Sequence, residues 1–304
     1  MLREDQYVRE TVVRTLWTIG KHPSRTQDAI SRILAISPGQ DKKLAGTICD
    51  AFLYDRISPQ NLSATQVDEL LSNLLSVPDL DEHGITMFLG WTSEHAPNAL
   101  IRFLERRMTR LAEKRAAGDW SYRLLPRQES AISLAGLRRL DLTEFRARTL
   151  ETIESDKLGR LELIDLFWST TALDENSFKL FRPWLSSTDE TKLNLAVSVL
   201  AEVPGNFALA HSNELLETLI AAERFGDDRL RKVIGHFVTR AHPLLQGGWE
   251  HDQSHVGMKA REQIEIALAD PKQHPLMKRF YEEMKSLALA HVLPRLEEED
   301  EEEF

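Results

Sequence analysis

The chain contains very little cysteine, which limits what can hold its fold together. Among 304 residues there is one cysteine, Cys49, so no disulfide can form within the chain. The place of Cys49 in the helical pattern described below predicts a buried side chain that acts as a small, unreactive hydrophobe. The hydrophobic share of 42% is large enough to supply a buried core.

Signals for strands, membrane spans and export are also missing. There is no long run of alternating β-branched residues and no Asn-Gly hairpin turn. No apolar run approaches the length of about 18 residues that a membrane-spanning helix needs. The first residues, Met-Leu-Arg-Glu-Asp, lack the apolar core of an export signal. We therefore expect an all-α protein in the cytoplasm that does not enter a membrane.

The chain lacks the common motifs of enzyme active sites. It has no Gly-x-x-x-x-Gly-Lys phosphate-binding loop and no Gly-x-Gly-x-x-Gly sequence after a strand. It also has no Gly-x-Ser-x-Gly elbow and no His-Glu-x-x-His zinc motif. These absences favour a non-catalytic protein without excluding an enzyme, and no cofactor is predicted.

A faint internal repeat of about 38 residues is the most informative feature that the chain does have. Apolar residues follow each repeat's opening aspartate at offsets of about 3, 7, 8 and 11, which lie on one face of an α-helix. Offsets seven and eight hold, for example, Val12 and Val13 in the first repeat and Ile48 and Cys49 in the second. The openings are Asp5, Asp41, Asp81, Asp156, Asp189 and Asp227. A fixed period of this length indicates stacked helical units.

Second helices are expected between these openings, and Pro97 marks the start of one because proline suits the first position of a helix. The aspartate-led helices, such as the one that opens at Asp189, resemble HEAT and armadillo-type repeat proteins over about residues 5 to 270. The resemblance implies an α-solenoid, a superhelix of stacked antiparallel helix pairs with a concave surface for a partner. We predict a single HEAT-like domain over residues 1–296.

The net charge of -10 is concentrated at one end of the chain. Residues 297–303 are all Glu or Asp, so the rest of the chain is much closer to neutral. An acidic run of this kind is typical of a solvated, disordered tail. We predict that residues 297–304 form such a tail, and an alternative is that it competes for a basic surface on this chain or on a partner.

The segment from Arg102 to Arg139 is the most basic part of the chain, with ten Arg or Lys residues against four acidic ones. Arg102, Arg106 and Arg110 recur every four residues and share one helix face. Arginines next to aromatic rings suit an acidic protein partner or a phosphate backbone, and a merely solvated face is the simplest alternative. The candidate partner-binding residues are Arg102, Arg106, Arg107, Arg110, Lys114, Trp120, Tyr122, Arg123 and Trp249.

Two insertions interrupt the repeat, at residues 118–123 and 242–257, and insertions in solenoids often map to the binding face. Trp120 lies in the first insertion and Trp249 in the second, where an exposed tryptophan suits an interface. His251 and His255 in the second insertion are four residues apart, the spacing of two zinc ligands on a helix. A solvated polar loop is the expected role of that stretch, so no metal site is predicted.

The sequence therefore predicts a non-catalytic scaffold or regulatory module that binds a protein partner through the basic helix and the two insertions. One alternative is a nucleic-acid-binding protein that uses the basic surface from Arg102 to Arg139. Another is the regulatory or sensor part of a larger assembly that contains an NTPase.

Overall fold

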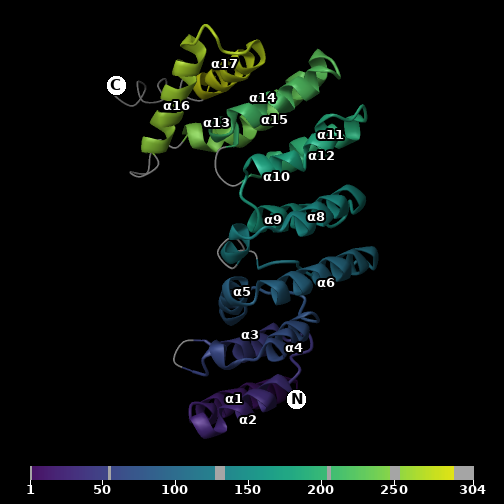
Figure 1. Cartoon of the computed structure of the whole chain (residues 1–304), viewed down its shortest axis with the longest axis vertical. Coiled ribbons are helices and arrows are strands. Elements are labelled where there is room, and N and C mark those ends of the chain that lie inside the picture. The colour runs from purple at the N-terminus through teal and green to yellow at the C-terminus, as the bar shows by residue number, and fades with distance from the viewer. Residues whose placement is uncertain (1, 54–55, 127–133, 204–206, 247–253, 291–304) are drawn as a thin grey trace, which may run out of the picture. The chain divides into compact units, whose positions relative to one another are not determined.

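A computed structural model describes residues 2–53, 56–126, 134–203, 207–246 and 254–290 (Figure 1). Every regular element in these ranges is helical, which confirms the all-α prediction for the described part of the chain. None of the described helices combines the length and the apolar character needed to cross a membrane. The predicted tail at 297–304 lies outside the described residues.

The chain divides into two compact units, residues 1–172 and 173–304. Unit 1 contains helix pairs joined by short connections, together with three short 3-10 helices. In chain order its elements are α1 (Leu2–Gly20), η1 (Pro23–Arg25), α2 (Thr26–Leu34), α3 (Lys42–Asp50), η2 (Pro59–Asn61), α4 (Ala64–Leu74), α5 (His83–His95), α6 (Pro97–Ala116), η3 (Ala135–Arg139), α8 (Thr143–Ser155) and α9 (Arg160–Thr170). The predicted single domain over residues 1–296 stays a prediction.

The helices of unit 1 pack in two rows (Figure 1). In one row α1 contacts α3, α3 contacts α5, α5 contacts η3, and η3 contacts α9. In the other row α2 contacts α4, and α4 contacts α6. Close approach within the first row depends on glycine, because a Cβ added at Gly136 of η3 would lie 2.5 Å from the carbonyl oxygen of Ser93 in α5.

The predicted helix starts are partly confirmed. Asp41 and Asp189 are N-caps, and each side chain accepts a hydrogen bond from a free amide of the first turn. Pro97 is the first residue of α6, as predicted. Asp156 was placed at a helix start, but it lies at the end of α8, where its carboxylate accepts from the amides of Leu158 and Gly159.

The repeat positions at offsets seven and eight form the core of unit 1, with one exception. Ile48 and Cys49 of α3 and Phe88 and Leu89 of α5 are buried. Burial raises the pKa of the Cys49 thiol, which keeps it in the unreactive neutral form. Val12, at the same offset in α1, is 44% exposed, which shows that the repeat pattern does not set burial at the first helix.

Unit 2 is built around one long helix. Its elements are α10 (Glu175–Lys179), α11 (Arg182–Leu185), α12 (Glu190–Leu200), α13 (Phe207–Ala210), α14 (Ser212–Glu223), α15 (Asp227–Gln246), α16 (Ser254–Ala269) and α17 (Pro275–Ala290). Helix α15 contacts α13, α14, α16 and α17, and ion pairs hold the last helices in place. Asp227 of α15 pairs with Arg279 of α17, and Glu265 of α16 pairs with Lys285 of α17.

Candidate interaction surfaces

The arginine face of α6 lies against the neighbouring helix α4. Arg102 donates to both carboxylate oxygens of Asp68 at 2.8 Å, and Arg106 donates to the Ser72 hydroxyl at 3.0 Å. Arg110 donates to the carbonyl oxygen of Leu75 at 3.0 Å. Because the three arginines and their acceptors recur at the same helical spacing, the two helices are joined by a ladder of hydrogen bonds.

Arg107 lies inside unit 1, so the structure corrects its predicted surface position. Its side chain is fully buried and donates to the carbonyl oxygens of Leu74, Val77 and Arg123. Its guanidinium lies 4.3 Å from the ring centroid of Tyr122, whose side chain is also buried. Burial lowers the pKa of Arg107 to about 10, and neither Arg107 nor Tyr122 offers a side chain to a partner.

Arg107 and Arg110 donate to the C-terminal end of a neighbouring helix, and this arrangement recurs in the chain. The last carbonyls of a helix have no partner within that helix and carry the negative end of its dipole. Arg107 and Arg110 donate to carbonyls at the end of α4, and Arg138 donates to the carbonyls of Trp168 and Ser169 at the end of α9. Three of the ten basic residues between Arg102 and Arg139 therefore donate to the ends of neighbouring helices.

The first insertion is held by charged contacts and leaves its tryptophan accessible. Trp120 is 57% exposed, and the buried guanidinium of Arg115 lies 4.9 Å from its ring centroid. Lys114 pairs with Asp119 at 3.2 Å. Of the predicted partner-binding residues in this insertion, Trp120 is the one whose ring is largely open to solvent.

Two further exposed apolar residues, Leu158 and Leu161, lie close in sequence to Glu162, which pairs with the arginine beside Trp120. Arg115 contacts both Trp120 and Glu162, and Glu162 also pairs with Arg123 at 3.0 Å. Leu161, directly before Glu162, is 74% exposed, and Leu158 in the preceding loop is exposed as well. The sequence pattern did not indicate these leucines, because an exposed apolar residue in a first helical turn cannot be distinguished from a core position by spacing alone.

The other predicted candidates lie outside what the structure describes. Trp249 and His251 are not described, and nothing is described of the side chain of His255. Within the described residues no group of His, Cys, Asp and Glu is arranged to hold a metal ion.

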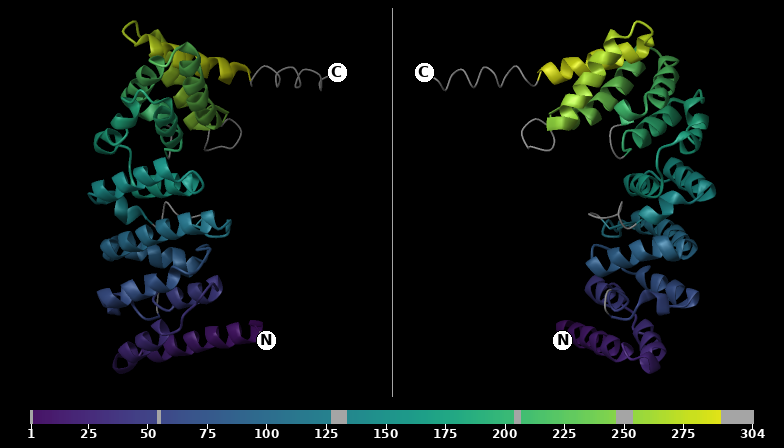
Figure 2. Two further views of the ribbon diagram at one scale, coloured as in Figure 1. Left: turned by 90° about the vertical axis from the view of Figure 1, so that its right-hand side faces the viewer. Right: turned by 60° about the vertical axis from the view of Figure 1, so that its left-hand side comes forward.

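Helix α1 presents an uncharged outer face, which we call the α1 face. Figure 2 shows α1 and α2 at one end of unit 1. Among the side chains of this face, Tyr7 is 72% exposed. Each threonine hydroxyl of the face donates to the carbonyl four residues earlier in α1, so that its methyl group is left for contacts. The α1 face consists of Tyr7, Val8, Thr11, Val12, Thr15, Thr18 and Ile19.

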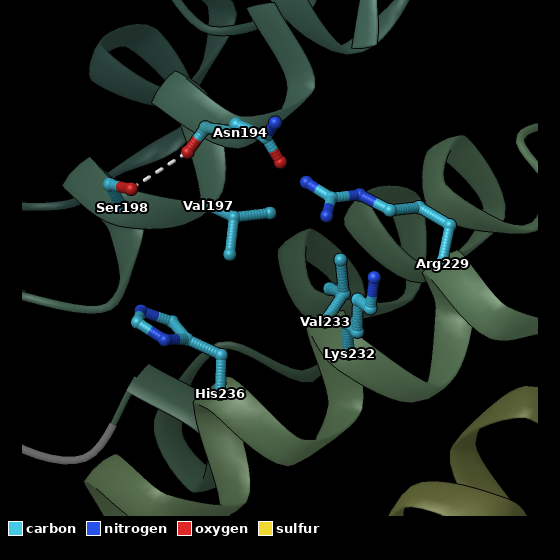
Figure 3. Close-up of a pocket in the computed structure, with 7 residues that line it drawn as sticks. All are labelled: Asn194, Val197, Ser198, Arg229, Lys232, Val233 and His236. Carbon is cyan, nitrogen blue, oxygen red and sulfur yellow. Dashed lines mark hydrogen bonds between the residues drawn. The ribbon is translucent and has the colours of Figure 1, made fainter. Parts of the chain in front are cut away.

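Unit 2 contains a partly open cavity of about 280 Å³ between α12 and α15, which the sequence reasoning also missed (Figure 3). Val197 and Val233 form its apolar part. Its polar lining residues are Asn194 and Ser198 from α12 and Arg229, Lys232 and His236 from α15. The three basic residues recur at helical spacing. They line a cavity only because α12, which is distant in sequence, supplies the opposite side.

Comparisons with known proteins leave the chain without a family. No protein-family model matches it, and searches of curated proteins and of solved structures found no match.

Proposed function

We propose that this chain is a non-catalytic, protein-binding scaffold built as a HEAT-like α-solenoid of stacked antiparallel helix pairs. The two rows of helices in unit 1 support the solenoid, because each row continues from one helix pair to the next. Proteins of this architecture expose long surfaces that contact partners along many helices. The cytoplasmic location remains part of this proposal.

The α1 face is the observation that carries the protein-binding role. Its described side chains are uncharged, and Tyr7, Val8, Val12 and Ile19 account for a run of large exposed apolar groups on one helix. Contiguous apolar surface of this kind is costly to leave in water and marks a contact site. A face of this composition on a long helix suits the apolar face of another helix.

The partner we propose is an amphipathic helix of a different protein. The packing of unit 1 supports this choice of partner, since α3 contacts α1 and α5 contacts α3 in the same row. The partner's helix would extend that row by covering Val8, Val12 and Thr15. Trp120, which is largely exposed, is a second contact in this proposal.

The test uses a photoreactive amino acid placed at Thr15, in the middle of the α1 face, in the full chain expressed in its native cells. Ala112 is the matched control, because it is exposed on α6 and lies away from the α1 face. We expect one protein to cross-link at Thr15 and not at Ala112, and the cross-link to be lost in the Val12→Arg variant. Val12 is already exposed, so this variant should keep its helical circular dichroism.

Other cross-linking results would contradict the proposal. A cross-link between two copies of this chain would make the α1 face a self-association surface. A cross-link to nucleic acid would favour the nucleic-acid-binding alternative. Equal cross-linking at Thr15 and Ala112, or none at Thr15, would show that the α1 face is not a docking surface.

A further inference from the structure

The cavity between α12 and α15 has basic groups on one side, and its described lining residues include no carboxylate. Arg229, Lys232 and His236 project from successive turns of α15, and the Arg229 guanidinium extends toward Asn194 of α12 (Figure 3). Arg229 and Lys232 carry the positive charge of this partly open space, in which Lys232 and His236 are exposed to solvent, and the two charges create a positive local potential. Such a space favours an anion over a cation or a neutral molecule.

The neighbouring carboxylates do not fill the cavity. Glu190 lies 3.3 Å from the Nε atom of Arg229, yet its own side chain is 54% exposed. Glu202 is paired with Arg240, one turn beyond His236. The contact of Arg229 with Glu190 is through Nε, and the terminal nitrogens of Arg229 have no hydrogen-bond partner in the described part of the chain, so they can donate to a ligand.

Lys232 lines the cavity, and it has no ion pair or hydrogen bond with any described residue. A lysine that lines a cavity without a partner contrasts with Lys42, Lys114 and Lys285, each of which pairs with a carboxylate. Asn194 adds an amide group on the opposite side, and Ser198 already donates to the Asn194 carbonyl at 2.8 Å. The available donors are therefore those of Arg229, Lys232 and Asn194.

The size and lining of the cavity indicate what kind of anion fits. Arginine and lysine together are typical of phosphate sites, because one supplies a planar fork of donors and the other a compact charge. A volume of about 280 Å³ exceeds what a single phosphate needs, and the apolar side formed by Val197 and Val233 can cover a small carbon framework. A partly open space of this size suits a small molecule that brings one phosphate group to the basic side.

We propose that the cavity lined by Asn194, Arg229, Lys232 and His236 binds the phosphate group of a small phosphorylated metabolite. Arg229 and Lys232 neutralise the phosphate, and the Asn194 amide orients it. The phosphate leaves and enters through the open side of the cavity. This site shares no residue with the α1 face, so the test of phosphate binding does not depend on the proposed protein-binding role.

The test measures binding of inorganic phosphate, of ribose 5-phosphate and of ribose to the full chain by isothermal titration calorimetry, with NMR shifts of His236 as a second readout. We expect ribose 5-phosphate to bind and ribose not to bind. Comparable binding of inorganic phosphate would mean that the phosphate alone is recognised. Binding of the ester only would show that the Val197 and Val233 side contributes to recognition.

Substitutions connect the binding to this cavity. Lys232→Gln should weaken binding roughly tenfold, because one charged hydrogen bond to the phosphate is lost. Arg229→Gln should weaken it at least as much, and Lys272→Gln, at an exposed lysine of the same unit, should leave it unchanged. Unchanged binding in Lys232→Gln, or no binding of either phosphate at millimolar concentration, would overturn the proposal. Since Lys232 has no partner to lose among the described residues, weaker binding in Lys232→Gln would not reflect misfolding.

Discussion

Helices α6 and α15 both carry a row of basic side chains, but they use their charges differently. In α6 the ladder of Arg102, Arg106 and Arg110 donates to groups on α4. In α15 Lys232 has no partner in the described part of the chain, and Arg229 has unused donors. The more basic segment of the sequence is thus the less available one, because availability depends on what the neighbouring helix offers.

The difference arises from what lies opposite each helix. Helix α4 offers acceptors to the arginines of α6. These acceptors are the carbonyls at its C-terminal end and the side chains of Asp68 and Ser72. The side of α12 that faces α15 carries Asn194, Val197 and Ser198 instead. An arginine beside acceptors becomes part of the fold, whereas a lysine beside an amide and two valines leaves its charge open for a ligand.

The largest expected effect comes from removing the buried arginine of α6. Arg107→Met keeps a long apolar side chain but removes the side-chain donor to the carbonyls of Val77 and Arg123, and it leaves the Leu74 carbonyl with the Val77 amide alone. Because buried acceptors without partners are costly, we expect a loss of about 3 kcal/mol in the free energy of unfolding, measured by urea denaturation. Arg106→Met is the control, since Arg106 is exposed, and it should change the unfolding free energy by about 0.5 kcal/mol or less.

A smaller loss from Arg107→Met, equal to that of Arg106→Met, would show that Arg107 does not support the fold. The contrast between α6 and α15 would then disappear. Urea denaturation of Lys232→Gln tests the α15 side of the comparison. We expect its free energy of unfolding to equal that of the wild type within about 0.5 kcal/mol.

The second prediction concerns the exposed pair at the start of the ladder. Arg102→Glu places a carboxylate beside Asp68 and should lower the free energy of unfolding by about 0.5–1 kcal/mol, because both side chains are half exposed and screened by solvent. The charge-swapped variant Arg102→Glu/Asp68→Arg should recover most of that loss. A loss that the swap does not recover would mean that the pair contributes nothing and that the charge of Arg102 is free for a partner.

How far the sequence predicts the fold depends on how local each signal is. Asp41, Asp189 and Pro97 were identified correctly because a cap or a first-turn proline acts within a few residues of itself. Asp156 shows the limit, since the same residue type satisfies loop amides between α8 and α9. Capping residues thus indicate that a helix end is near. An aspartate alone does not show whether that end is the N-terminus or the C-terminus of the helix.

The interaction surfaces were harder to predict, because they depend on contacts between distant segments. The burial of Arg107 follows from carbonyls about one repeat away, which spacing within α6 cannot reveal. The exposure of Val12 follows from the lack of a covering helix among the described residues, although its repeat offset equals that of buried Ile48. Trp120 was the exception, because a tryptophan in an insertion is accessible for a local reason.

The smallest effect that sharpens the comparison is the titration of His236 at the edge of the α15 cavity. Burial and the charge of Arg240 lower the pKa of His236 below its ordinary value of 6.5, while Glu202 acts in the opposite direction. Arg229 and Lys232 add positive charge to the same cavity. The imidazole is therefore neutral at pH 7 and gains its charge only at lower pH. NMR titration should show this lowered pKa, and Arg240→Gln should raise it.

Sulfate, whose own charge is constant over this range, should bind more tightly as the pH falls through the pKa of His236, and His236→Gln should remove that dependence. A sulfate affinity that stays the same from pH 8 to pH 5 would show that His236 does not face the bound anion.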